Sequence, residues 1–159
     1  MASLQQLVID YLAGPKALRA AVAGMTREHL LAKPVPGKMS TLEVVAHLAD
    51  FDPILADRAK RVIAEDNPTL VGADENRFLA ALAYHERELE EELTIIEKTR
   101  QQLARILRKL PDSALARTGT HTERGPRTLE QLLTGAINHI PHHVTFILEK
   151  RRALGLPVS

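Results

Sequence analysis

The stretch that decides the fold runs from Thr128 to Leu154 and reads TLEQLLTGAINHIPHHVTFILEKRRAL. Its apolar residues and two of its histidines recur at steps of three or four, which predicts one face of a long amphipathic helix. His139 and His143 therefore point to the same side, one turn apart, where two imidazoles can share a metal ion. His142 is rotated by about 100° from His143 and is expected to leave that face. The predicted face consists of Leu129, Leu132, Ala136, His139, His143 and Ile147.

Three further segments carry the same helical periodicity together with helix-capping residues. The first is interrupted at Gly14-Pro15, and the second is expected to bend at Pro53. Short helical turns are expected near Thr26 and over residues 77–82, whereas residues 118–128 form the longest irregular stretch. The three predicted long helices cover residues 4–23, the segment from a cap at Ser40 or Thr41 to residues 65–68, and residues 84–110.

Four long amphipathic helices around one core, with almost no strand signal, predict an all-α protein. We expect a four-helix bundle of the up-down type, with longer connections between the first and second helices and between the third and fourth. A chain of 159 residues suits one domain, so residues 1–159 are expected to form a single unit. Aromatic residues make up only 3% of the chain, which leaves an aliphatic core and favours helices over sheets.

Composition restricts the functions open to the chain. A net charge of +1 gives no indication of nucleic-acid binding. Because the chain has no cysteine, any metal must be held by histidine, carboxylate or water, and any thiol chemistry needs an external thiol. The sequence contains no run of 18 apolar residues, so no membrane-spanning helix is predicted. The N-terminal residues lack the pattern of a signal peptide, so we expect a cytoplasmic protein.

A third histidine makes a metal site worth considering. His47 lies three residues after Val44 and four before Phe51, so it borders the inward stripe of the second long helix. A helix bundle builds metal sites from side chains on facing helices. Three neutral imidazoles with an open position would suit Zn²⁺, Ni²⁺ or another divalent ion. The alternative for His47 is a hydrogen-bonded core histidine, and His121 is expected to be a loop residue rather than a ligand.

Two charged residues near these stripes have open roles. Asp50, one turn past His47, is placed either to accept a hydrogen bond from a ligating imidazole or to pair with Arg100. Arg100 lies on the apolar stripe of the third helix, between Ile96 and Leu103. Its guanidinium either pairs with a buried carboxylate such as Asp50 or reaches solvent along its apolar stem. No general base is evident beside the three histidines.

Several motifs, taken together, resemble the DinB/YfiT-like superfamily. They are GKMSTLEVVAHLAD at residues 37–50, AEDNP at residues 64–68, and HTERGPRTL at residues 121–129, followed by His139 and His143. The resemblance extends over nearly the whole chain. It implies a four-helix bundle, often a homodimer, with a divalent metal held by one histidine of the second helix and two of the last. By position these are His47, His139 and His143.

The resemblance also implies an activity. Characterised branches of the superfamily are thiol-dependent transferases and isomerases that use bacillithiol or mycothiol, and many members are called metal-dependent hydrolases. We therefore expect an enzyme in which the metal, Zn or Ni, activates an external low-molecular-weight thiol to attack an electrophilic small molecule. The alternatives are hydrolysis by metal-activated water, or a non-catalytic bundle that binds a metal or a small molecule.

Three positions depart from the pattern of the superfamily. Met39 stands where a Trp is often found, which is expected to change packing only. Phe146 stands where a Gln commonly follows the last histidine, so a polar group near the site is absent. Pro141 lies between the two paired histidines and removes the N–H that would bond the carbonyl of Ile137, which predicts a kink in the helix.

Overall fold

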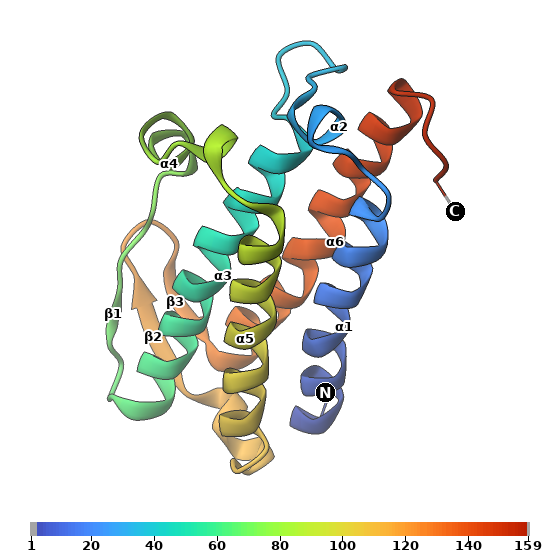
Figure 1. Ribbon diagram of the computed structural model, residues 1–159. Helices are drawn as coiled ribbons and strands as arrows, with labels where there is room; N and C mark the ends of the chain where they lie inside the picture. Colours follow the sequence, from blue (N-terminus) through green and yellow to red (C-terminus); the bar gives the residue numbers. More distant parts are fainter. Residues whose placement is uncertain (1–2, 159) are drawn as a thin grey trace.

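The computed structural model describes residues 3–158, and within them four long helices form a bundle (Figure 1). This confirms the predicted fold class. No helix among the described residues is both long and apolar enough to cross a membrane. The long helices are α1 (Leu4–Val22), α3 (Thr41–Ala64), α5 (Leu89–Leu107) and α6 (Leu129–Ala153).

The order of the helices around the bundle explains its long connections. α1 packs against α5 and α6, and α3 packs against the same two helices, so α1 and α3 are diagonal, as are α5 and α6. The connections 23–40 and 108–128 cross these diagonals, and both are long, as predicted. α1 and α3 run in opposite directions, whereas α5 runs parallel to α3 and α6 parallel to α1 (Figure 1). The helices therefore do not alternate in direction along the chain, as the predicted up-down type would, and the segment 65–88, which returns along the whole bundle, is long as well (Figure 1).

Short elements occupy these connections. A three-stranded sheet lies beside α3, with β1 parallel to β2 and β2 antiparallel to β3 (Figure 1). The short elements are α2 (Arg27–Leu31), β1 (Thr69–Leu70), α4 (Glu75–Ala81), the 3₁₀ turns η1 (Tyr84–Glu86) and η2 (Asp112–Ala116), β2 (Thr118–His121) and β3 (Gly125–Thr128).

The prediction that residues 118–128 are irregular is wrong, because they form the hairpin β2–β3. Gly125 provides the turn with a φ of 69°, in the region that favours glycine. Gly119 lets the hairpin approach α3 closely, since a Cβ atom there would lie 2.9 Å from Cγ2 of Val62. The strands are thus stabilised by packing on a helix that is distant in sequence, and such packing cannot be predicted from local periodicity.

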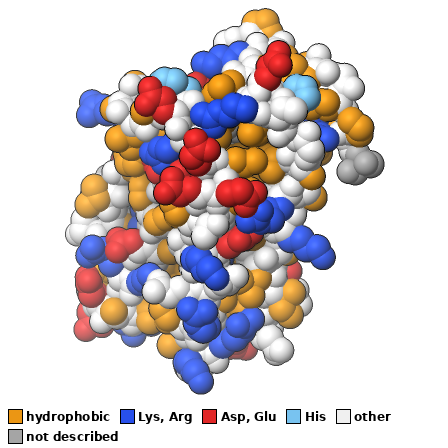
Figure 2. Space-filling model, viewed as in Figure 1, with side chains coloured by type: hydrophobic (Ala, Val, Ile, Leu, Met, Phe, Trp, Pro, Cys, Tyr) orange, Lys and Arg blue, Asp and Glu red, His pale blue; other side chains and the backbone are white. Residues whose placement is uncertain are grey.

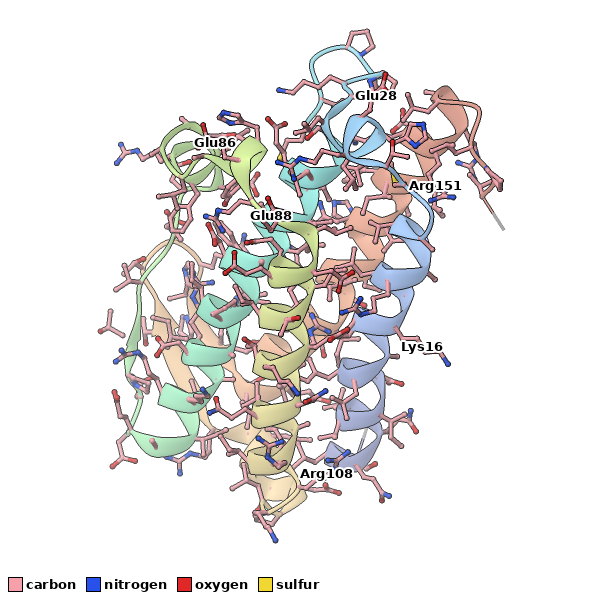
Figure 3. All side chains as sticks on the ribbon, in the orientation of Figure 1. Lys16, Glu28, Glu86, Glu88, Arg108 and Arg151 are labelled. Atoms are coloured by element: carbon pink, nitrogen blue, oxygen red, sulfur yellow. The ribbon has the colours of Figure 1, made fainter. Side chains whose placement is uncertain are left out.

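The predicted start of the third helix at Tyr84 is also wrong. The chain turns at Ala83, whose φ is 49°, forms η1, and enters α5 only at Leu89. Arg87 holds this corner by donating to the carboxylates of Asp50 and Glu92. The charges of α5 follow its dipole: acidic side chains gather over its first turns and basic ones over its end, where Arg108 lies (Figures 2 and 3).

The apolar core consists of two clusters separated by a buried ion pair. The larger cluster gathers residues such as Leu7, Val62 and Leu107 at the end of the bundle that carries the N-terminus of α1. The smaller one gathers residues such as Leu48 and Ile140 toward the other end. Arg100 and Asp52, both fully buried, lie between them and are joined by Nη2–Oδ1 and Nε–Oδ1 contacts of 2.7 and 3.0 Å.

Arg100 therefore pairs with Asp52, and the suggested pairing with Asp50 is wrong. Two residues along an α-helix turn a side chain through about 200°, so Asp50 and Asp52 leave α3 on opposite sides. The guanidinium of Arg100 also donates to the carbonyls of Tyr11 and Ala136, at 2.7 and 2.8 Å. One side chain of α5 thus binds all three other long helices.

The Gly14-Pro15 interruption of α1 serves this arrangement. Pro15 has no N–H, so the carbonyl of Tyr11, four residues earlier, has no partner within the helix and accepts from Arg100 instead. Gly14 makes room for the guanidinium, since a Cβ atom there would lie 2.7 Å from Nη1 of Arg100. What reads in the sequence as a helix interruption is a contact point between two helices.

Candidate metal centre

The structure brings the three predicted histidines together. His47 is contributed by α3, which begins with a capping box between Ser40 and Glu43, and it is only 2% exposed. His139 and His143 come from α6. The Nε2 atoms of His47 and His139 lie 3.2 Å apart. One nitrogen of each ring can be chosen so that all three lie within 4.8 Å of one another.

The helical phase of α6 separates the last two histidines as predicted. His143 is buried at 9% exposure, whereas His142 is exposed and does not belong to the group of three whose nitrogens converge, although it lines the same cavity. α6 continues without interruption from Leu129 to Ala153 although Pro141 lies inside it. Pro141 therefore does not exchange His142 for His143. The fully buried stripe differs slightly from the predicted one, because Leu133 and Ile140 are buried where Leu132 and His139 are half-buried.

Burial keeps the three imidazoles neutral. It lowers the pKa of His47, with a partial opposing effect from the carboxylates of Glu75 and Asp50. Burial, followed by repulsion from His47, lowers the pKa of His139 to about 4. For His143, burial and the neighbouring histidines lower the pKa to about 3. Neutral imidazole is the form that ligates a metal, so the cluster is in a metal-binding state at neutral pH.

The cluster fits a divalent metal ion. The Nδ1 atoms of His139 and His143 are buried and have no hydrogen-bond partner among residues 3–158. Nitrogens that bind one tetrahedral ion at 2.0–2.1 Å lie about 3.4 Å apart, and the observed separations bracket this value. Three imidazoles are nitrogen ligands and suit a divalent transition metal better than Ca²⁺ or Mg²⁺, which prefer oxygen.

Asp50 has a different neighbour from the one expected for it. Its two carboxylate oxygens accept from the guanidinium of Arg87, at 3.0 and 3.1 Å. No hydrogen bond within residues 3–158 joins Asp50 to a ring nitrogen, so its effect on His47 is one of charge at a distance. His121, expected in a loop, ends β2, where its Nδ1 accepts from the N–H of Glu123.

The structure adds a carboxylate that the sequence did not indicate. Glu75, the first residue of α4, places its Oε2 atom 3.9 Å from Nε2 of His47, and its side chain is 65% exposed. The Asp74 side chain caps α4 and so sets where Glu75 begins the helix. The sequence predicted a short helical turn at residues 77–82, but nothing in it showed that this helix docks over the histidines.

These groups line a cavity of about 540 Å³. Its wall combines the histidine cluster with apolar surface from Met39 and Phe146, two of the three positions that depart from the superfamily pattern. Phe146 lies edge-on against His143 with ring centroids 5.7 Å apart. A cavity of this size holds a small organic molecule beside the histidines. Its further lining residues are Gly37, Lys38, Val44, Glu75, Asn76, Leu79, Tyr84, Arg124, His142, Glu149 and Lys150.

Comparison with known proteins decides the family. The model of the DinB superfamily matches residues 11–147, a range that includes all three histidines. The chain belongs to the DinB superfamily. The family predicted from the sequence motifs is thereby confirmed.

Two further proteins resemble this chain over most of its length. A protein of Oceanobacillus iheyensis is 28% identical over 133 residues, covering 84% of this chain and 77% of that protein. One of Geobacillus thermodenitrificans is 28% identical over 145 residues, covering 89% and 80%. Both carry the name “Putative metal-dependent hydrolase”.

Two solved structures of DinB type share the fold. YfiT from Bacillus subtilis has a TM-score of 0.89 at 24% identity, covers 97% of this chain and 89% of its own, and is described as a “probable metal-dependent hydrolase with an unusual four-helix bundle topology”. A DinB family structure from Exiguobacterium sibiricum has a TM-score of 0.68 at 21% identity, covering 100% and 97%.

The neutral histidines make the stability of this DinB-superfamily protein depend on pH. In the metal-free protein, the free energy of unfolding is expected to fall between pH 7.5 and 5. Unfolded imidazoles take up protons near pH 6.5, whereas the folded pKa values of His139 and His143 are about 4 and 3, so acid favours the unfolded state. The loss is on the order of 1–2 kcal/mol per imidazole, allowing for solvent in the cavity.

Urea unfolding at the two pH values measures this dependence. The double variant His139→Gln/His143→Gln should lose less stability on acidification than the parent, because it lacks both imidazoles. His142→Gln, at an exposed position, should keep the pH dependence of the parent. An unchanged dependence in the double variant would contradict the assignment.

Proposed function

We propose that this protein is a divalent-metal-dependent hydrolase of small molecules, with His47, His139 and His143 as metal ligands. The observation that carries the proposal is the placement of the Glu75 carboxylate beside the histidine cluster in a cavity of about 540 Å³. The descriptions of the two curated relatives agree with this reaction class.

Each group of the cavity has a defined role in this proposal. A divalent ion held by three imidazoles supplies Lewis acidity, which polarises the substrate and acidifies water. Glu75 Oε2 accepts a proton from the attacking water, for which a carboxylate within hydrogen-bonding reach of the reacting centre is required. The exposure of Glu75 lets it move toward the substrate. Met39 and Phe146 exclude water from one side of the cavity.

A thiol-dependent transfer is the second candidate, because the same three histidines and cavity could serve an external thiol. In that reaction the metal would ionise the thiol, and Glu75 would not be needed as a base. A non-catalytic metal- or ligand-binding bundle is the third. A homodimer and a cytoplasmic location remain predictions from the resemblance and the sequence.

Metal analysis followed by an activity screen separates these functions. The untagged protein should contain close to one Zn or Ni per chain. With that metal, esters and amides should be hydrolysed without a thiol. Turnover of an electrophile only when a thiol is added would favour the transferase, and metal without turnover of either substrate class would favour the binding bundle.

Glu75→Gln is expected to lower kcat by about 10²–10³-fold, within the range for loss of a general base. Metal content and melting temperature should stay close to the parent values, because the side chain is 65% exposed and its contact with His47, at 3.9 Å, is longer than a hydrogen bond. Glu86→Gln is the matched control, since Glu86 is exposed near the start of α5 and does not line the cavity (Figure 3). A kcat of Glu75→Gln equal to that of the parent would show that Glu75 is not the general base. The argument for hydrolysis over thiol transfer would then fail as well.

A further inference from the structure

The cavity contains a buried cation that the proposed reaction does not use. Lys150 lies on α6, seven residues after His143, and is only 2% exposed, yet it lines the same cavity as the histidines. Positions seven apart share a helix face and are separated by about 10 Å along the axis. The Nζ atom donates to the carbonyl of Phe146 at 3.3 Å, so the side chain turns back toward the histidines.

Lys150 has no ionic partner. No carboxylate within residues 3–158 lies within 4.0 Å of its ammonium group, which has three N–H donors and uses one of them. The neighbouring Arg151 shows the contrast, because it is also buried but donates to three backbone carbonyls. A buried charge without a partner costs free energy, which an anionic ligand in the cavity would recover.

Nearby carboxylates do not fill this role. Glu43 is engaged by the ammonium of Lys33 at 3.0 Å and by the N–H of Ser40 at 2.9 Å. Glu149 and Glu75 line the cavity but form no ion pair with Lys150. A second cation, Lys38, lines the cavity as well; its repulsion of Lys150 is opposed by attraction from the charges of Glu149 and Glu43, neither of which comes within ion-pair distance. Arg124 lines the cavity too, so three cations stand against the two carboxylates of the lining, and this excess of positive charge favours an anion.

We propose that Lys150 and Lys38 form an anion-binding subsite, which holds a carboxylate or phosphate group of the substrate while the bond to be cleaved lies at the histidines. Anion binding by the two lysines stands by itself, whereas the placement of the bond to be cleaved at the histidines rests on the proposed function. The subsite defines the substrate class: an anionic small molecule whose charged group lies less than about 10 Å from the reacting bond, because the Lys150 side chain turns back from its helical position toward the histidines. Lysine binds such groups as a compact point charge.

Binding to the metal-free protein tests the subsite without requiring activity. Benzoate, phenyl phosphate and the neutral benzamide are titrated by calorimetry at low ionic strength, where charge interactions are least screened. The parent should bind at least one anion, and Lys150→Met should bind it at least tenfold more weakly. Lys16→Met should bind like the parent, since Lys16 projects from α1 away from the bundle (Figure 3). The preferred anion distinguishes carboxylate from phosphate substrates.

A second variant guards against misfolding. Lys38 is exposed, so Lys38→Met cannot disturb the core and should weaken anion binding about threefold. Parent-like anion binding in both variants, equal binding of benzamide and benzoate, or no anion binding by the parent would each overturn the subsite.

A kinetic comparison separates this inference from the proposed function. In the metal-loaded enzyme, the kcat/KM ratio of an anionic ester over a neutral ester with the same leaving group should fall about tenfold in Lys150→Met. Absence of any hydrolysis would reject the hydrolase while leaving the binding result intact. Hydrolysis with an unchanged ratio would reject the subsite while leaving the hydrolase intact.

Discussion

His139→Ala and His143→Ala are each expected to lose the bound metal, whereas His142→Ala is expected to keep it. The first two rings belong to the cluster whose nitrogens lie within 4.8 Å of one another, and His142 is exposed. With no cysteine in the chain, loss of one of three imidazoles leaves the exposed carboxylate of Glu75 as the nearest replacement, which is not held in place as a buried imidazole is. Removal of a ligand should therefore lower the affinity far more than removal of an exposed neighbour.

Thermal unfolding measures this difference. A metal that binds only the folded state stabilises it by about 2.7 kcal/mol at a hundredfold excess over Kd. Added Zn²⁺ or Ni²⁺ should thus raise the melting temperature of the parent and of His142→Ala, and leave the other two variants nearly unchanged. Metal analysis of all four proteins is the independent measurement. Equal metal content and equal thermal response in the four proteins would show that the site does not exist.

Arg100→Leu is expected to lower the free energy of unfolding by about 3–5 kcal/mol, the usual cost of removing one partner of a buried ion pair. It would leave Asp52 charged without a partner in the core, and would also free the carbonyls of Tyr11 and Ala136. Urea unfolding at pH 7.5 measures the loss. Arg105→Leu, at an exposed position of the same helix, should change stability little.

The double variant Arg100→Leu/Asp52→Leu provides the sharper comparison. Apolar replacement of a whole buried pair is often neutral or stabilising, so the double variant should recover much of the stability lost by Arg100→Leu. A double variant less stable than the single one would mean that the backbone contacts of Arg100 outweigh its pairing with Asp52.

The helices and the histidine pair were predictable because the information is local. Ser40, one of the two caps considered for α3, forms a capping box, and Thr128 forms another at the start of α6; each needs only residues three apart. The pairing of His139 with His143 follows from the period of one helix in the same way. To predict that His47 lies beside this pair, the bundle fold had to be predicted first. The apolar stripes of two helices then indicated that all three histidines face its interior.

The features that were missed depend on contacts between distant segments. The hairpin at residues 118–128 exists because Gly119 lets it approach Val62 on α3. Glu75 reaches His47 because α4 docks above it, and no periodicity in a seven-residue helix determines where it docks. The partner of Arg100 was wrongly predicted because Asp50 and Asp52 lie on opposite sides of α3. Which side faces Arg100 depends on how the four helices are arranged around the bundle, and the sequence of α3 alone does not show this.

The division of the core by Arg100 and Asp52 has a consequence for how such proteins diverge. No residue described as lining the cavity belongs to the larger apolar cluster, which lies on the other side of the ion pair. Substitutions that reshape the cavity, as at Met39 and Phe146, therefore leave that cluster intact. One end of the bundle can acquire new ligand preferences over evolutionary time while the other preserves the fold, which persists here at 24% identity to YfiT.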